Sequence, residues 1–128
     1  PELKLSENIQ ASDSLENVMK EASIVFIATP SIVFKKIIER ISNLLMEDAY
    51  VISCTKGILG DPFRTLSKMI SSNFSNPIGV LSGPNLAEEI ASSHLSGTVI
   101  ASDNKILTQS VIEGLSTDFF KVYENDDG

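Results

Sequence analysis

The sequence has little of what several common classes of protein require. It contains one cysteine and no tryptophan among 128 residues, so an internal disulfide is excluded and nothing points to an oxidising compartment. The longest uninterrupted apolar run, Ile24 to Ala28, is far shorter than the ~20 residues of a membrane-spanning helix. No signal-peptide pattern opens the sequence. We therefore expect a cytoplasmic protein with no membrane span.

Positive charge is also scarce. Ten Lys and Arg residues stand against 17 Asp and Glu residues, which gives a formal net charge of −7. Such a chain repels phosphate backbones and acidic membrane surfaces. We expect no nucleic-acid partner, and an anionic ligand would have to be held locally by a few cations or backbone N–H groups. One cysteine and one histidine also give no support to a metal site.

The composition is that of one globular domain, with 42% apolar and 21% charged residues. No stretch rich in Gly, Ser or Pro divides the chain, so we expect residues 1–128 to belong to one domain. The sequence begins at Pro1 rather than at Met, and it closes on Asp126-Asp127-Gly128. We therefore expect a segment of a longer protein.

Short β-branched runs alternate along the chain with longer segments of helical periodicity. The predicted strands are residues 23–28, 50–53, 78–82, 97–101 and 119–123, with a further short strand at 8–11. Asp13 and Glu16 are spaced as a capping box, and Pro30, Pro62 and Pro84 suit first helical positions. Continuous apolar strands indicate a sheet covered on both faces. The predicted fold is α/β, doubly wound, with a mostly parallel sheet and helices on both faces.

A Gly-Pro turn follows the predicted strand 78–82. Gly83 would let a ligand approach the backbone, and Pro84 would begin a helix whose next N–H groups, starting at Asn85, suit an anion or a hydroxyl. Lys56 follows strand 50–53 and would project toward the same carboxyl edge, where open α/β sheets bind ligands. Taken separately, the Gly-Pro turn could be an ordinary helix start and Lys56 an ordinary surface lysine. If both bind a ligand, they face one cleft.

Two other reactive side chains have plain structural explanations. Cys54 could act as a nucleophile only beside a base, and the single histidine, His94, is predicted near the end of the helix over 84–92. We expect Cys54 to be a small buried residue and His94 a solvated helix-end residue. No Gly-x-Gly-x-x-Gly turn is present, although doubly wound nucleotide-binding folds normally carry one after the first strand.

Four segments together resemble the middle of the bacterial-type NAD(P)-dependent glycerol-3-phosphate dehydrogenases. They are Ile27–Ser31, Ser53–Gly57, Leu81–Glu89 and Phe120–Asn125. Their order and separations agree with the family over essentially the whole chain. The resemblance implies hydride transfer between NAD or NADP and the sn-glycerol 3-phosphate/dihydroxyacetone phosphate pair, for glycerophospholipid biosynthesis. The chain would be the second half of a Rossmann domain that lacks the first βαβ unit.

The resemblance also implies roles for individual residues. The implied substrate-binding residues are Lys56, Gly83 and Asn85. The implied cofactor-binding residues are Lys56, Ala87, Ala28 and Pro30. Asn85 stands where many relatives have Ser or Thr, all of which offer a polar group. The family's Gly-rich turn is expected upstream, and its general-base lysine on a helical catalytic domain is expected downstream. No catalytic residue is therefore expected in these 128 residues, and the chain alone is predicted to be inactive.

Two other functions stay open at this stage. One is a non-catalytic dinucleotide-binding or interaction module that kept the fold, and the other is a related dehydrogenase acting on a hydroxy acid. In the strand order of a Rossmann sheet the missing first strand is central, so the strand containing Val25 and Ile27 would have an unpaired apolar edge. We expect marginal stability or self-association through that edge, and a homo-oligomer is compatible with the sequence.

Overall fold

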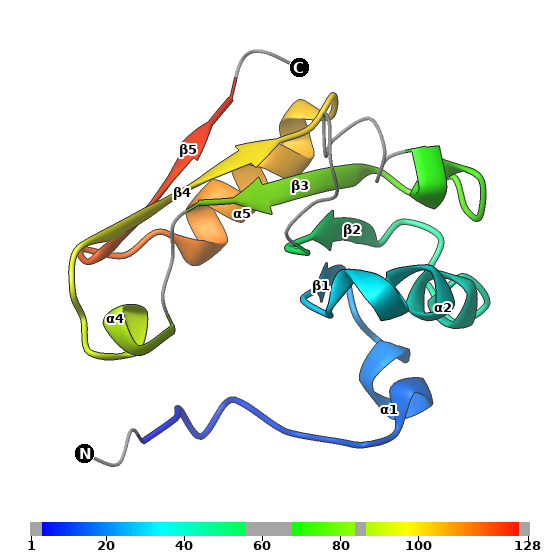
Figure 1. The fold of residues 1–128 in the computed structure, drawn as a ribbon, viewed down its shortest axis with the longest axis horizontal. Helices are drawn as coiled ribbons and strands as arrows, with labels where there is room; N and C mark the ends of the chain where they lie inside the picture. Colours follow the sequence, from blue (N-terminus) through cyan, green and yellow to red (C-terminus); the bar gives the residue numbers. More distant parts are fainter. Residues whose placement is uncertain (1–3, 56–67, 84–86, 126–128) are drawn as a thin grey trace.

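The structure is a computed structural model that describes residues 4–55, 68–83 and 87–125. Five strands form one sheet in the order β1-β2-β3-β4-β5 (Figure 1). The strands are β1 (Ile24–Ile27), β2 (Tyr50–Ser53), β3 (Ile78–Ser82), β4 (Ser96–Ala101) and β5 (Phe120–Glu124). β1, β2 and β3 are mutually parallel, β4 is antiparallel to β3, and β5 is parallel to β4. The mostly parallel sheet is confirmed, whereas the reversal between β3 and β4 was not predicted.

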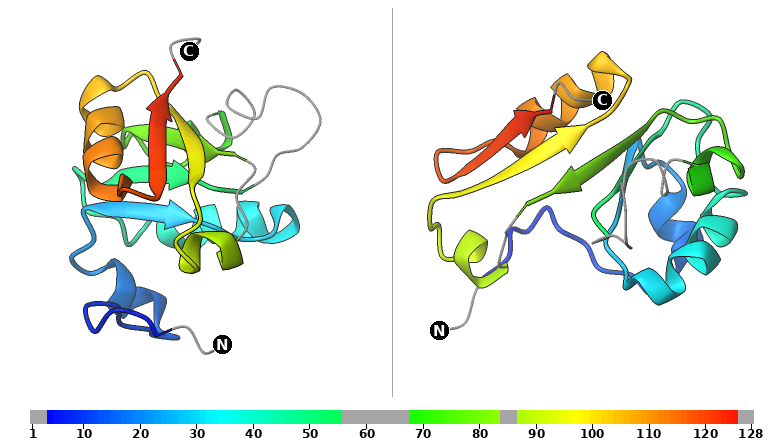
Figure 2. Two further views of the ribbon diagram at one scale, coloured as in Figure 1. Left: turned by 90° about the vertical axis from the view of Figure 1, so that its left-hand side faces the viewer. Right: turned by 45° about the horizontal axis from the view of Figure 1, so that its top comes forward.

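Helices lie on both faces of this sheet, as Figure 2 shows. They are α1 (Leu15–Met19), α2 (Ser31–Ile41), α4 (Ala87–Ala91) and α5 (Lys105–Leu115), and residues 68–71 are also helical. None of the helices in the described ranges is long and apolar enough to cross a membrane. The predicted α/β class with helices on both faces is therefore confirmed.

Two apolar clusters hold the layers together, one on each face. The cluster under α1 and α2 consists of Met19, Ile27, Phe34, Ile38, Ile41, Val51 and Ile70. The cluster under α5 consists of Ile52, Ile100, Leu107, Val111 and Val122. Successive strand residues point to opposite faces, so Val51 enters the first cluster and Ile52 the second, and both are fully buried. This two-sided burial explains why β2 has an uninterrupted apolar sequence.

β1 is an edge strand. Among the described strands it pairs only with β2. α5 packs mainly against β3, β4 and β5, and Phe26 in β1 is 41% exposed. The expected unpaired apolar edge is therefore present in the described part of the chain.

The start of α1 differs from the prediction by one residue. Ser14, not Asp13, is the N-cap, and its Oγ accepts a hydrogen bond from the Asn17 N–H at 3.3 Å. The same hydroxyl donates to Glu16 Oε2 at 3.4 Å. Because α1 begins at Leu15, Ser14 lies where a side-chain oxygen reaches the third helical N–H, and Asp13 lies one residue too early.

Two further local predictions need correction. Residues 8–11 form no strand, because a strand needs a hydrogen-bonded neighbour and no described strand pairs with them. Pro30 is the N-cap of α2 rather than its first helical residue, which is Ser31. Pro62 and Pro84 lie outside the described residues.

Candidate functional site

The carboxyl ends of β1, β2 and β3 lie along one edge of the sheet, because the three strands are parallel neighbours (Figure 1). Residues 28–30 follow β1, residues 54–55 follow β2, and Gly83 follows β3. In open α/β sheets ligands bind along this edge. We take it as the candidate functional site and call it the carboxyl edge.

The loops after β1 and β2 are tied together by three hydrogen bonds. The Cys54 N–H donates to the Ile27 carbonyl at 2.8 Å. The Thr55 hydroxyl donates to the Thr29 carbonyl at 3.0 Å and reaches the Ile27 carbonyl at 3.4 Å. A further bond lies within the segment after β2, where the side chain of Ser53 accepts from the Thr55 N–H at 3.3 Å. Thr55 is only 8% exposed, so these bonds are shielded from water and hold the two loops in one arrangement.

The first turn of α2 opens onto the same edge. Its N-cap, Pro30, offers no side-chain hydrogen bond, and the turn contains no acidic residue. The positive end of the helix dipole and the first N–H groups are therefore not compensated by the helix's own side chains. The start of α4 is different, because Glu88 and Glu89 lie in its first turn. The side chains of α2 therefore leave its N-terminus open to an electron-rich ligand.

One hydroxyl at this edge is unusual. The Oγ1 atom of Thr29 is buried and has no hydrogen-bond partner within the described part of the chain. The carbonyl of the same residue accepts from Thr55. The Thr29 carbonyl is thus held by a hydrogen bond from Thr55, whereas the Thr29 hydroxyl has no partner within the described part of the chain.

The structure describes four of the six residues that the sequence placed at the site. Ala28 and Pro30 are exposed beside the end of β1, Gly83 is half-buried directly after β3, and Ala87 is exposed at the start of α4. Lys56 and Asn85 lie outside the described residues. The predicted hollow between Lys56 and Gly83 therefore stays a prediction, although Thr55, which precedes Lys56, lies two residues after the end of β2.

The two other reactive side chains do not form a catalytic pair in the structure. Cys54 is half-buried rather than fully buried, and burial raises the pKa of its thiol, so the neutral and weakly nucleophilic form prevails. His94 is exposed and lies beyond the end of α4. Within the described ranges no cluster of three or more His, Cys, Asp or Glu side chains could hold a metal ion.

Sequence reasoning missed the contribution of Thr55. The signal that could have found it is a hydroxyl residue two positions after the last residue of β2, within Ser53-Cys-Thr-Lys-Gly57. The acceptor, the Thr29 carbonyl, is 26 positions away in the sequence. Only the register between β1 and β2 shows that these two residues meet.

A mostly parallel α/β sheet with helices on both faces is the architecture of Rossmann-type domains, and this chain has that fold. Residues 1–108 match the family described as NAD-dependent glycerol-3-phosphate dehydrogenase N-terminus. The chain belongs to this family.

Individual relatives agree over nearly the whole chain. It is 44% identical to the glycerol-3-phosphate dehydrogenase [NAD(P)+] of Alcanivorax borkumensis and 38% identical to that of Acinetobacter baylyi, over 99% of its length in both cases. These matches span 37% and 36% of the relatives. A crystal structure of glycerol-3-phosphate dehydrogenase from Coxiella burnetii superimposes with a TM-score of 0.90 at 30% identity, over 99% of this chain and 39% of that one. The chain thus spans well under half the length of the proteins it resembles.

Proposed function

We propose that this chain is the second half of the dinucleotide-binding domain of a glycerol-3-phosphate dehydrogenase [NAD(P)+]. The full-length enzyme transfers a hydride between NAD(P)H and dihydroxyacetone phosphate to give sn-glycerol 3-phosphate, a precursor of glycerophospholipids. The observation that carries this proposal is the 44% identity to such an enzyme across 99% of the chain. The parallel strand ends and the open first turn of α2 supply the matching geometry.

The first turn of α2 is the part of the described chain that suits the nicotinamide cofactor. Ala28 and Pro30 are exposed next to the first turn of α2, whose N-cap makes no side-chain hydrogen bond and which contains no acidic residue. Polar atoms of a dinucleotide can accept hydrogen bonds from such N–H groups. Ala87 at the start of α4 completes the proposed cofactor contacts. When bound, the nicotinamide supplies or accepts the hydride.

The substrate side of the site consists of residues around the Gly-Pro turn. We assign contacts with the phosphorylated substrate to Gly83 and Asn85, and contacts with both ligands to Lys56. The lysine ammonium would offset part of the substrate's negative charge, which the net charge of −7 otherwise repels. The proton that joins the carbonyl oxygen during reduction comes from a lysine in the remainder of the full-length enzyme. We place this enzyme in the cytoplasm.

Substrate choice separates this proposal from its alternatives. The test measures NADH and NADPH oxidation by the full-length protein with dihydroxyacetone phosphate and, separately, with 2-keto acids such as pyruvate. We expect turnover with dihydroxyacetone phosphate only, and a Lys56→Ala variant should lose at least about tenfold in kcat/KM. Lys121→Ala serves as a control, because Lys121 is an exposed lysine on β5.

Two results would overturn the assignment. Turnover with a keto acid in place of the phosphorylated ketone would identify a hydroxy-acid dehydrogenase. Binding of NADH without turnover of any carbonyl substrate would identify a non-catalytic dinucleotide-binding module. Equal activity of the Lys56→Ala and Lys121→Ala variants would remove Lys56 from the site.

A further inference from the structure

We propose that Thr55 is a positioning residue for the cofactor: its hydroxyl fixes the loop after β1 in the arrangement that receives the dinucleotide. This inference rests on the proposed function and names a residue that the family resemblance did not single out. It concerns how the cofactor-facing loop of residues 28–30 is held, and Thr55 itself is not assigned a contact with either ligand.

The position of Thr55 follows from the strand register. The last paired residues of the parallel strands are Ile27 in β1 and Ser53 in β2. Two positions further along each strand, Thr29 lies opposite Thr55, and backbone pairing has ended there. The Thr55 hydroxyl donates to the Thr29 carbonyl at 3.0 Å in place of a ladder bond. A side chain therefore sets the spacing of the two loops at the point where the strands separate.

The chemistry at this point requires a hydrogen-bond donor. Both groups that the Thr55 side chain reaches, the carbonyls of Ile27 and Thr29, are acceptors only. Thr55 is 92% shielded from solvent, since its exposed fraction is 8%, so water cannot readily replace the hydroxyl. Removing the donor leaves the partly buried Thr29 carbonyl without this bond, which is costly.

The bond acts directly on the start of α2. The carbonyl that accepts it belongs to the peptide link between Thr29 and Pro30, and Pro30 is the N-cap of α2. A shift of that carbonyl moves Pro30 and the first helical N–H groups, which are the proposed cofactor contacts. Because Pro30 has no N–H of its own, no ladder bond from that residue can hold the link.

A purely structural role of Thr55 predicts a different pattern of NADH affinities, and four variants separate the two roles. Thr55→Val keeps the shape and removes the donor, whereas Thr55→Ser keeps the donor and removes a methyl group. Thr98→Val is a matched control, because Thr98 is also buried, at 2% exposure, and its hydroxyl has no partner within the described part of the chain. Thr55→Cys provides a weaker donor of similar size if the valine variant folds poorly.

The experiment titrates each full-length variant with NADH and follows the fluorescence of the bound cofactor, with thermal unfolding of the unliganded protein measured in parallel. We expect Thr55→Val to raise the Kd for NADH about five- to tenfold, which corresponds to one hydrogen bond. Thr55→Ser and Thr98→Val should bind NADH as the wild type does, and Thr55→Cys should fall between. The KM for dihydroxyacetone phosphate should change less than the KM for NADH.

Several outcomes would overturn the inference, and one would overturn the proposed function alone. NADH binding by Thr55→Val with wild-type affinity overturns it, and so does equal weakening in Thr55→Val and Thr98→Val. A loss of thermal stability in Thr55→Val with unchanged Kd shows a structural role only. If the wild type binds NADH but does not reduce dihydroxyacetone phosphate, the proposed function fails while the Kd comparison still decides the role of Thr55. If the wild type does not bind NADH, both fail.

Discussion

Gly79 in β3 lies directly beneath Leu107 of α5, so that a Cβ on Gly79 would come 2.9 Å from Leu107 Cδ2 and 3.2 Å from Ile100 Cδ1. Both neighbours are fully buried, and side chains in a close-packed interior have little room to shift. The absence of a side chain at residue 79 therefore allows α5 to approach the sheet closely.

A Gly79→Ala substitution should destabilise the folded protein by about 1–3 kcal/mol, because it overpacks this contact. Urea unfolding of the full-length protein measures the change. The control is Gly114→Ala in α5, where a Cβ meets nothing within 4 Å and removal of a helical glycine should stabilise by up to about 1 kcal/mol. Similar stability changes in both variants would show that close packing at Gly79 is not the cause.

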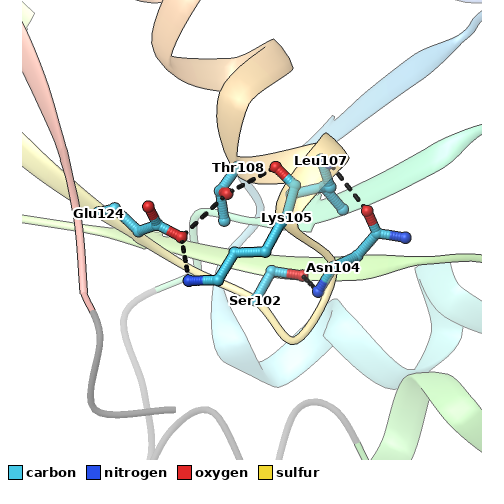
Figure 3. A network of polar contacts seen from close by, with 6 residues as sticks. All are labelled: Ser102, Asn104, Lys105, Leu107, Thr108 and Glu124. Atoms are coloured by element: carbon cyan, nitrogen blue, oxygen red, sulfur yellow. Dashed lines mark hydrogen bonds and ion pairs between the residues drawn. The ribbon is translucent and has the colours of Figure 1, made fainter.

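The start of α5 and the end of β5 are joined by a charged network (Figure 3). Lys105 Nζ lies 2.6 Å from Glu124 Oε1, and the buried Thr108 hydroxyl donates to the same oxygen at 3.1 Å. The hydrogen bond from Lys105, with a smaller one from Thr108, holds the pKa of Glu124 below its usual value of 4.5. The network thus favours the ionised carboxylate in the folded state.

The sign of the resulting pH dependence follows from this depressed pKa. The contribution of Glu124 to stability is present above the unfolded pKa and is lost as pH falls through the folded pKa. Glu124→Gln should therefore be less stable than the wild type at pH 7, and the difference should shrink progressively below about pH 4.5. Chemical unfolding across this range measures it. A difference that is constant with pH would mean that the charge of Glu124 does not contribute.

α4 ends in a conformation that ordinarily favours glycine. Ser93 has a φ of 59°, its N–H donates to the Ile90 carbonyl, and the following His94 N–H donates to the Glu89 carbonyl at 2.9 Å. This is the Schellman arrangement, in which the left-handed residue is usually Gly. Ser93→Gly should stabilise the protein by about 0.5–1 kcal/mol.

The neighbouring Ser92 provides the control for this prediction, because it is also exposed and does not have a positive φ. Ser92→Gly should leave stability unchanged or lower it, since glycine there only adds freedom to the unfolded chain. Thermal unfolding compares the two variants. Stabilisation by both, or by neither, would contradict a backbone strain located at Ser93.

The open edge at β1 predicts how the 128-residue chain behaves alone. Its unpaired backbone groups and the 41% exposed Phe26 should drive self-association at micromolar concentrations. Phe26→Lys should reduce it, because an edge charge opposes strand pairing, whereas Ile106→Lys on α5, at a residue that is 70% exposed, should not. Sedimentation velocity measures the species present. A monodisperse wild-type monomer with a high melting temperature would contradict the prediction.

Much of the fold could be predicted from the sequence because local patterns determine it. β2 and β3 were predicted with the bounds that the structure shows, since their continuous apolar runs end at polar or turn residues. The direction of β4 could not be predicted, because a run such as residues 97–101 has the same pattern in either direction. Ser14 and Asp13 are both good capping residues, and only the position of Leu15 decides between them.

The candidate site was only partly predictable for a similar reason. Gly83, Ala28 and Pro30 follow strands directly, so their place at the carboxyl edge is a consequence of parallel strand order. The contact between Thr55 and Thr29 depends on the pairing register of β1 and β2, which sequence patterns do not specify.

The central claim is that this chain supplies part of a glycerol-3-phosphate dehydrogenase site whose remainder lies elsewhere in the full-length enzyme. The most direct test compares NADH oxidation by the full-length protein and by the 128-residue chain at equal concentrations, with dihydroxyacetone phosphate as the substrate. We predict turnover by the full-length protein and none above background by the chain alone, because the general base and the pyrophosphate-binding turn are expected outside it. Turnover by the chain at a rate near that of the full-length protein, or no turnover by either, would contradict the account.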